Sequence, residues 1–338
     1  MKLPVLVCLA WISFFLHPTH QLTAAEPAVL RGKVEYAPAK DESGIPARFR
    51  LAAHSFEFEA RSLGLDSRTL EVWYVTFPSP VKTASAQNNT VHCEYYQPKG
   101  AGKNGDAKAP AVIVLHILGG DFALSRIFCN ALAQHGVAAL FVKMPYYGPR
   151  RDPASKQRMI SPDPRETVEG MTQAILDIRR AAAWLSARDE VDPQQLGIFG
   201  ISLGGITGAL AATAEPRLQN VCLLLAGGDV GKIATAAWEL PDGREIRRAW
   251  TEKGGTREEF AAILTAVDPV AYGQNVRGKR ILMLNALSDE IIPRVCTESL
   301  WTAFGKPKIV WYDGGHYSVA RHIFGALHEV THFFGDPK

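Results

Sequence analysis

The sequence predicts an α/β fold, in which a mainly parallel central sheet carries helices on both faces and the chain adds a small cap insertion. Two observations lead to this prediction. From Ala111 onward, short apolar runs typical of buried strands alternate with longer segments at helical spacing, which is the pattern of parallel strands joined by crossover helices. Before that point residues 26–105 are β-rich, because segments 55–60, 70–75 and 90–96 alternate like strands between Pro and Gly turns.

The composition is that of one globular domain with a large core. The chain has 338 residues, of which 47% are hydrophobic and 21% charged, and these are ordinary values for such a domain. The net charge of +3 is near balance, and the sequence has no basic stripe with interleaved aromatic residues. These features argue against nucleic-acid binding.

The first 25 residues have the features of a signal peptide. A Met-Lys pair precedes an apolar run over residues 3–16, which is too short to span a bilayer. Small residues stand at positions 23–25, before an expected cleavage at Glu26. We therefore expect a secreted or periplasmic protein without stable membrane insertion after cleavage; the alternative is an uncleaved anchor.

Cleavage leaves four cysteines, and an exported protein can pair them. Cys222 lies in an apolar run over residues 221–225 and is expected to be a small buried hydrophobe. The sequence determines neither the oligomeric state nor a pairing among Cys93, Cys129, Cys222 and Cys296. Asn88-Asn89-Thr90 is a glycosylation sequon that matters only if the host glycosylates.

The most informative motif is Gly200-Ile201-Ser202-Leu203-Gly204, which matches G-x-S-x-G. It follows an apolar strand run over residues 196–199 and continues into a helix of small apolar residues at 205–212. A sharp turn from strand to helix brings backbone segments together, so the flanking positions require glycine. Such a turn exposes the Ser202 hydroxyl and directs the first N–H groups of the helix at a nearby anion.

Two later strand runs each end in a further candidate catalytic residue. The run over residues 280–286 is followed by Asp289, and the run over 308–312 is followed by His316 in a Gly-Gly turn. Ser202 needs a neutral imidazole to take its proton as it attacks a carbonyl carbon, and the imidazole needs a carboxylate that fixes its tautomer. The order of these residues in the chain is Ser, Asp, His.

With this motif and this order, the chain resembles the α/β-hydrolases, specifically the dienelactone-hydrolase and secreted-esterase group. The resemblance covers about residues 105–335 and implies a catalytic domain over 106–338, with a cap insertion at about 228–268. Dienelactone hydrolases use a cysteine nucleophile, whereas this chain has serine. The resemblance therefore implies a cofactor-free serine hydrolase that cleaves carboxylic esters, with a small-molecule or carbohydrate-linked ester as substrate.

Two other carboxylates in the sequence could serve as the acid of the triad. Glu290 is adjacent to Asp289, and Asp313 lies three residues before His316. The pattern Asp-x-x-x-Pro after a strand favours Asp289 as the acid. We expect Glu290 and Asp313 to be turn formers or surface charges, with the Glu290 side chain pointing away from the histidine.

The oxyanion hole is expected at His116-Ile117-Leu118-Gly119-Gly120, which follows a strand run over residues 111–115. The resemblance assigns one donor to the backbone N–H of Leu203 and the other to this loop. Aligning His116 with the family histidine selects Leu118, although Ile117 stands where glycine is usual, and the choice between Ile117 and Leu118 stays open. We expect His116, Tyr146 and Tyr147 to line the substrate pocket. Loop packing is the alternative for the tyrosines, and orientation of the loop is the alternative for His116.

One motif points to a different chemistry. His328-Glu329-Val330-Thr331-His332 matches H-E-x-x-H, which binds zinc when a third ligand is present. The extended pattern requires histidine at position 338, where this chain has Lys338, so we predict no metal. The alternatives to an esterase are thus a peptidase similar to prolyl oligopeptidases, a non-catalytic binding protein on a hydrolase scaffold, and a zinc metalloprotease using His328, Glu329 and His332.

Overall fold

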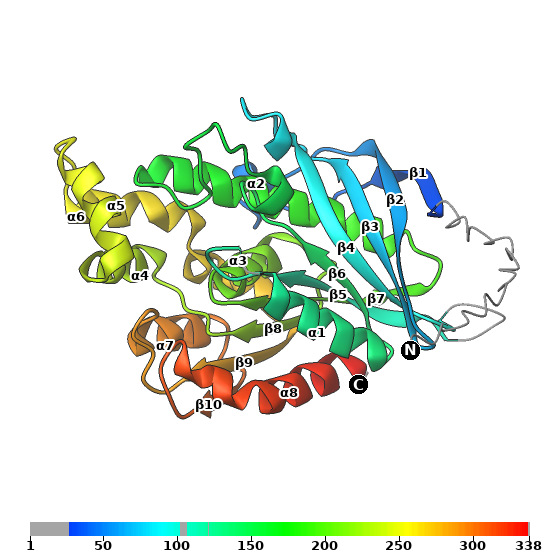
Figure 1. The fold of residues 1–338 in the computed structure, drawn as a ribbon. Coiled ribbons are helices and arrows are strands. Elements are labelled where there is room, and N and C mark those ends of the chain that lie inside the picture. Colours follow the sequence, from blue (N-terminus) through cyan, green and yellow to red (C-terminus); the bar gives the residue numbers. More distant parts are fainter. Residues whose placement is uncertain (1–26, 102–106, 121, 337–338) are drawn as a thin grey trace, which may run out of the picture.

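The protein is described here by a computed structural model, which covers residues 27–101, 107–120 and 122–336 (Figure 1). The expected signal peptide at 1–25 and Lys338 lie outside these residues. Within them, one sheet has the strand order β1-β2-β3-β4-β6-β5-β7-β8-β9-β10. The strands are β1 (Val29–Tyr36), β2 (His54–Asp66), β3 (Leu70–Pro78), β4 (Thr90–Pro98), β5 (Ala109–Leu115), β6 (Ala138–Val142), β7 (Val191–Ile201), β8 (Asn220–Leu224), β9 (Arg280–Ala286) and β10 (Lys308–Tyr312).

The sheet has two halves of different character. Strands β1 to β4 form an antiparallel meander, and β4 also pairs antiparallel with β6. From β6 to β10 every neighbouring pair is parallel. Strands β5, β6, β8 and β9 are buried along nearly their whole length, which explains why they read as continuous apolar runs rather than as alternating ones. The edge strand β10 is only partly buried. The predicted fold class, a mainly parallel sheet within an α/β fold, is confirmed.

Helices cover both faces of this sheet (Figure 1). Helices α1 and α8 pack on one face, and α2 and α3 pack on the other. The helices are α1 (Ala123–Gln134), α2 (Pro164–Ser186), α3 (Leu203–Ala214), α4 (Val230–Ala236), α5 (Pro241–Thr251), α6 (Arg257–Leu264), α7 (Arg294–Ala303) and α8 (Ile323–Gly335). Short 3₁₀ helices are η1 (Ala47–Phe49), η2 (Gln87–Asn89), η3 (Gly148–Arg150), η4 (Ala237–Glu239), η5 (Thr265–Val267), η6 (Pro269–Val276) and η7 (Ser318–His322).

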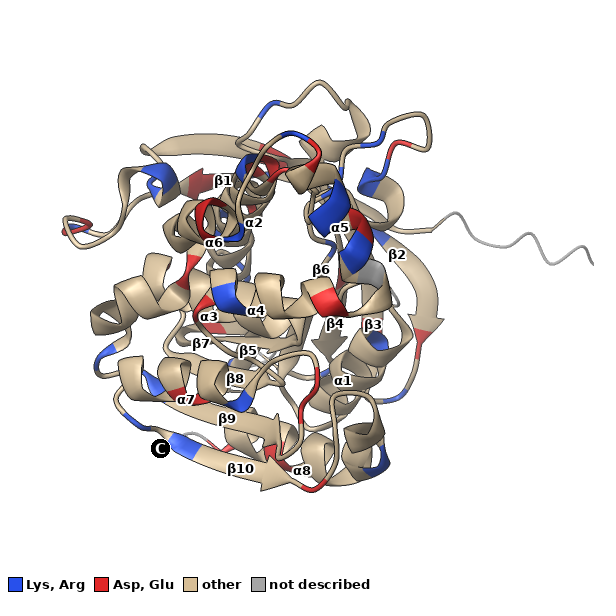
Figure 2. Cartoon of the chain, turned by 90° about the vertical axis from the view of Figure 1, so that its left-hand side faces the viewer, with Lys and Arg blue, Asp and Glu red and all other residues tan. Residues whose placement is uncertain are grey.

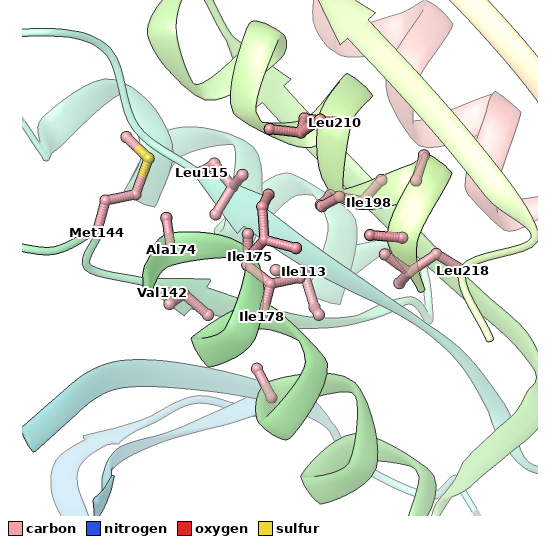
Figure 3. Packing of buried hydrophobic residues seen from close by; sticks show 14 of the residues in the cluster. Ile113, Leu115, Val142, Met144, Ala174, Ile175, Ile178, Ile198, Leu210 and Leu218 are labelled. Atoms are coloured by element: carbon pink, nitrogen blue, oxygen red, sulfur yellow. The ribbon is translucent and has the colours of Figure 1, made fainter. Parts of the chain in front are cut away.

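The largest part of the core lies between α2, α3 and the parallel strands. Figure 3 shows Ile175 and Ile178 of α2 against Ile113 of β5, with Leu210 of α3 nearby. Helix α2 begins sharply because Asp163 accepts a hydrogen bond from the N–H of Arg165, and a proline occupies the first turn. The parallel pairing of the strands places the carboxyl ends of β5, β7, β9 and β10 at a common edge of the sheet.

The segment between β8 and β9, predicted as a cap, contains α4, η4, α5 and α6, and it projects from one end of the molecule (Figure 1). Its two tryptophans, Trp238 and Trp250, are buried and pack edge-on against Phe260. They form a small core inside the segment. Helix α5 carries three arginines and one glutamate, at positions 244, 247 and 248 and at 245, and most of its charged surface is basic (Figure 2).

Several features bear on the cysteines, the sequon and the membrane. All four cysteines of the described residues are buried and unpaired. Asn88 is also fully buried, and its side-chain amide donates to Gln173 Oε1 at 2.8 Å, so the folded chain does not present this sequon to a glycosylating enzyme. Among the helices within 27–336 that the structure describes, none is long and apolar enough to cross a membrane.

Candidate active site

Ser202 stands at the turn between β7 and α3, in a backbone conformation that few residues adopt. Its φ is 54° and its ψ is −114°, a sparsely populated region that persists only where the surrounding structure enforces it. A Cβ atom at Gly200 would collide with the backbone of Gly204, and a Cβ atom at Gly204 would lie 2.6 Å from the carbonyl oxygens of Leu115 and His116. The two flanking glycines are therefore required by the close approach of the backbone.

Three side chains from three strand ends meet at this turn. The Nε2 atom of His316 lies 2.9 Å from Ser202 Oγ, and its Nδ1 atom lies 2.9 Å from Asp289 Oδ2. A carboxylate only accepts hydrogen bonds, so Nδ1 carries the proton and the unprotonated Nε2 faces the hydroxyl. All three side chains are buried; that of Asp289 is only 3% exposed. The geometry is that of a nucleophile, a base and an orienting acid.

The position of Asp289 follows from the tip of β9. Its Oδ1 atom accepts hydrogen bonds from the backbone N–H groups of Ile291 and Ile292, at 2.9 and 2.7 Å. The turn after the strand thus holds the carboxylate from one side, and His316 contacts it from the other.

The structure brings neither rival acid to the imidazole. Asp313 forms an ion pair with Arg321 at 2.7 Å, and its side chain is 82% exposed. Glu290 accepts a hydrogen bond from the backbone N–H of His316, at 2.8 Å from its Oε2 atom. The expectation that Glu290 is merely a surface charge pointing away needs correction, because it fixes the backbone of the histidine loop. No motif signals this contact, since it joins a side chain to a backbone group 26 residues away.

His116 is buried at the end of β5, where it organises the expected oxyanion loop. The backbone N–H of Met144 donates to its Nε2 atom at 3.1 Å, so the proton is on Nδ1, which donates to Ile117 O at 2.8 Å. A trans peptide is planar, so the N–H of Leu118 points away from the imidazole when the carbonyl of Ile117 points toward it. Burial lowers the pKa of His116 to about 4, which keeps this arrangement neutral.

A cavity of about 450 Å³ opens beside Ser202. Leu118 and Leu203, the two expected oxyanion residues, both line it. The remainder of its wall comes largely from α2, α3 and the cap segment, through residues such as Met171, Ile206, Ile233, Ile246 and Phe260. Sequence reasoning missed these positions, because each is an ordinary apolar helix residue whose neighbours are set only by the fold.

The expected pocket residues His116, Tyr146 and Tyr147 do not line this cavity, which corrects the prediction. The ring of Tyr147 packs edge-on against His116, with 4.6 Å between ring centroids. The backbone N–H of Tyr146 donates to Asn88 Oδ1 at 3.0 Å. These residues are used to hold the loops after β5 and β6 together, so loop packing, the alternative reading, describes them.

The H-E-x-x-H residues lie on α8, with 4.2 Å between the rings of His328 and His332. Glu329 forms an ion pair with Lys308 at 2.9 Å, and His332 Nδ1 lies 3.3 Å from Asp336. Across 27–101, 107–120 and 122–336, no group of three or more His, Cys, Asp or Glu side chains is placed to hold a metal ion.

Sequence comparisons relate the chain to hydrolase-fold proteins. Residues 75–239 match the model of the family described as alpha/beta hydrolase domain containing 18. The chain is 28% identical over 183 residues to Rv2627c, an uncharacterized protein of Mycobacterium tuberculosis. This alignment covers 54% of the chain and 42% of the relative, so the chain matches less than half of the relative's length. A second uncharacterized protein of that organism, Rv2307c, is 26% identical over 63% of each chain.

Solved structures show the same architecture at low sequence identity. An acetyl xylan esterase from Paenibacillus sp. R4 has a TM-score of 0.64 and 20% identity, covering 81% of this chain and 87% of that one. Acetyl xylan esterase 1 from Thermoanaerobacterium sp. JW/SL YS485 has a TM-score of 0.59 and 20% identity, covering 83% and 88%. At this identity the likeness establishes the fold. Taken together with the family match over residues 75–239 and the strand-turn-helix at Ser202, it shows that the chain has the α/β-hydrolase fold.

Proposed function

We propose that the protein is a serine hydrolase that cleaves carboxylic esters through an acyl-enzyme on Ser202. The observation that carries the proposal is the continuous chain of hydrogen-bonding contacts from Ser202 through His316 to Asp289. Nucleophile, base and acid each come from a separate strand end, and the strained turn at Ser202 holds the hydroxyl in place. A scaffold used only for binding has no need to maintain this strain.

In the first half-reaction, Ser202 Oγ attacks the ester carbonyl carbon while His316 Nε2 takes the hydroxyl proton. Asp289 stabilises the imidazolium that forms. The carbonyl oxygen becomes negatively charged, and the backbone N–H groups of Leu203 and Leu118 are the proposed donors that stabilise it. Losing one such donor typically costs about 100- to 1000-fold in rate.

The first half-reaction ends when His316 gives its proton to the departing alcohol, and the acyl group remains on Ser202. In the second half-reaction, water enters, loses a proton to His316 Nε2 and attacks the acyl carbon. His316 then returns that proton to Ser202 Oγ as the acid leaves, which restores the serine. Every proton in this sequence moves through His316. The proposed reaction therefore needs no metal and no other cofactor.

Esters are favoured as substrates by two observations. The nucleophile is serine, and several of the solved structures with this fold are named as esterases. Their names describe those proteins, and their low identity to this chain makes their substrates a guide to the bond cleaved rather than to the groups on either side of it.

The proposal is tested by replacing the nucleophile. Ser202→Ala is expected to lower the turnover of p-nitrophenyl butyrate by about a million-fold, because removing such a serine disables the whole triad. Circular dichroism and thermal unfolding establish that the variant is folded. A fluorophosphonate probe should label the wild type on Ser202 and leave the variant unlabelled.

A chelator separates this proposal from the zinc alternative. Incubation with EDTA should leave ester hydrolysis unchanged. Zinc bound at one ion per chain, and lost together with activity, would establish the metalloprotease reading; full activity of Ser202→Ala would remove the serine mechanism.

A further inference from the structure

The cavity beside Ser202 has an almost wholly apolar wall. Among the polar side chains that line it, Ser161 donates to Glu166 at 2.5 Å, and Thr167 Oγ1 accepts from the backbone N–H of Ser161 at 2.9 Å. Glu290 is bound to the backbone of the histidine loop. These three groups already have partners inside the protein, so they are poorly placed to replace the water around a hydroxylated substrate. Besides the nucleophile, the other polar side chain of the wall is that of Tyr317, which is 72% exposed.

We propose that this cavity binds the acyl chain of the substrate, and that the preferred esters carry an unbranched apolar acyl group of medium length rather than acetyl. The inference rests on the proposed ester hydrolysis at Ser202 and adds the class of acid that the enzyme releases. A two-carbon acyl group would fill only a small part of this cavity and would leave most of its apolar wall in contact with water, whereas a longer acyl chain would displace that water.

The position of the catalytic groups assigns the cavity to the acyl side of the ester. The leaving alcohol must receive its proton from His316 Nε2, so its oxygen lies next to that atom. Ser202, Leu203 and the expected oxyanion residue Leu118 form part of the cavity wall. Glu290 and Tyr317, which flank the histidine loop, also reach the wall, but the imidazole of His316 does not. The wall thus includes the nucleophile and the expected oxyanion residues, but not the imidazole beside which the alcohol leaves. We therefore assign the cavity to the acyl chain and not to the alcohol.

The volume of the cavity limits the length of the chain. A methylene group takes up about as much space as a water molecule, roughly 30 Å³, so 450 Å³ sets a ceiling of about fifteen carbons. A flexible chain fills such a space incompletely, and we expect the best substrates to have about eight to ten carbons. Until the cavity is filled, each added methylene should raise kcat/KM about two- to fourfold.

The cap segment provides the wall where the length of the chain is set. Ala234 on α4 and Ile246 on α5 both line the cavity, and both come from the insertion between β8 and β9. A larger side chain at Ala234 shortens the available space, and a smaller one at Ile246 extends it. Ala236 lies on the same helix two residues further along and is not part of the wall.

The first experiment measures kcat/KM for p-nitrophenyl esters from acetate to dodecanoate. We expect octanoate to exceed acetate by roughly 60-fold or more, from six added methylenes, with a decline beyond the optimum. Ethyl octanoate and octyl acetate, which have the same atoms, test the side of the ester; ethyl octanoate should be the better substrate. A flat or falling series, or a preference for octyl acetate, would overturn the inference.

The second experiment changes the cavity. Ala234→Phe should lower the ratio of octanoate to acetate hydrolysis about four- to sixteenfold, as expected when about two methylenes lose their site. Ile246→Ala should move the optimum to longer chains. The matched control Ala236→Phe should keep the wild-type ratio. Because the readout is a ratio, it stays interpretable in a partly inactivated variant, and unchanged ratios in both cavity variants would refute the inference.

Failure of the inference can be told apart from failure of the proposed function. If acetate is hydrolysed as well as octanoate and Ser202→Ala removes both activities, the serine esterase stands and the acyl preference is wrong. If Ser202→Ala retains the activity, the proposed function is wrong and the inference falls with it.

Discussion

Two buried carboxylates in this molecule have similar burial and opposite surroundings. The side chain of Asp289 is 3% exposed and that of Glu94, on β4, is 7% exposed. Asp289 contacts two backbone N–H groups and the imidazole of His316. Glu94 contacts two permanently charged groups, because Lys143 Nζ lies 2.7 Å and Arg126 Nη2 lies 2.8 Å from its Oε1 atom.

The difference lies in when the charge of each carboxylate is compensated. Glu94 is compensated at all times, and Lys143 is itself buried at 2% exposure, so each of these two charges depends on the other. Asp289 faces an imidazole that, in the proposed reaction, becomes positively charged when it takes the proton of Ser202. A carboxylate of the first kind maintains the fold, whereas one of the second kind stabilises a transition state. Burial alone does not distinguish them.

The largest effect that we expect is the loss of turnover in Asp289→Asn, which tests the role proposed for Asp289. An asparagine keeps the shape but offers the imidazole the wrong partner, so His316 adopts the wrong tautomer and turnover falls by up to about ten-thousand-fold at neutral pH. Turnover of p-nitrophenyl butyrate measures this loss, and urea unfolding should show a much smaller change in stability than in rate.

The matched control is Asp313→Asn, which removes an exposed carboxylate three residues before His316. Its turnover should stay close to that of the wild type. If Asp313→Asn is crippled while Asp289→Asn remains active, the acid has been misassigned, although the serine hydrolase proposal would survive.

The next largest effect that we expect is a loss of unfolding free energy in Glu94→Gln, which tests the structural role of Glu94. This variant leaves the buried Lys143 without its counter-charge, which typically costs about 3–5 kcal/mol of unfolding free energy. Turnover of the molecules that remain folded should change little, because Glu94 touches no member of the triad. Denaturant unfolding and the activity per folded molecule measure the two quantities separately.

An exposed pair provides the control for this variant. Glu59→Gln breaks the ion pair with Arg31, whose side chain is 74% exposed, and should cost no more than about 1 kcal/mol. Equal losses from Glu94→Gln and Glu59→Gln would show that the buried cluster does not stabilise the fold.

Acid should weaken the Glu94 cluster in a defined pH range. Burial alone would raise the pKa of Glu94, but the hydrogen bonds and charges of Arg126 and Lys143 outweigh it and lower the pKa from 4.5 to about 2. A carboxyl with a depressed folded pKa contributes stability above its unfolded pKa and loses it as pH falls toward the folded one. The stability difference between wild type and Glu94→Gln should therefore shrink between about pH 4.5 and pH 2. A constant difference over that range would contradict the assigned pairing.

The features that could be predicted from the sequence are those determined by a short stretch of backbone. Ser202, Asp289 and His316 could be found because each follows a recognisable strand, and the glycines around Ser202 report the close approach of the backbone locally. The strands β9 and β10 begin and end at the residues expected from their apolar runs. Features of this kind depend on the local backbone, so a short stretch of sequence is enough to indicate them.

Features made by distant partners could not be predicted. Glu94 and Lys143 are 49 residues apart, and nothing in the neighbourhood of either indicates a buried pair. Tyr146 and Tyr147 were expected in the pocket because they follow a strand on the catalytic side. The ring of Tyr147 instead packs against His116, and the backbone N–H of Tyr146 donates to Asn88. The cavity wall has the same origin, since it is assembled from the five helices α2 to α6 and from several loops.

The smallest expected effect concerns Glu290, which belongs to neither class of carboxylate. It is exposed and lacks a charged partner among the contacts described, but it accepts a hydrogen bond from the backbone N–H of His316. Its role depends on an acceptor atom and not on its charge. Glu290→Gln retains such an atom and should keep kcat/KM close to the wild-type value, whereas Glu290→Ala loses the bond and should reduce it about two- to tenfold. The pH profile of kcat/KM should keep its shape in both variants, because neither change touches the imidazole. A loss in Glu290→Gln as large as that in Asp289→Asn would mean that the charge of Glu290 acts on His316 directly, and the two neighbouring carboxylates would then have to share the role of the acid.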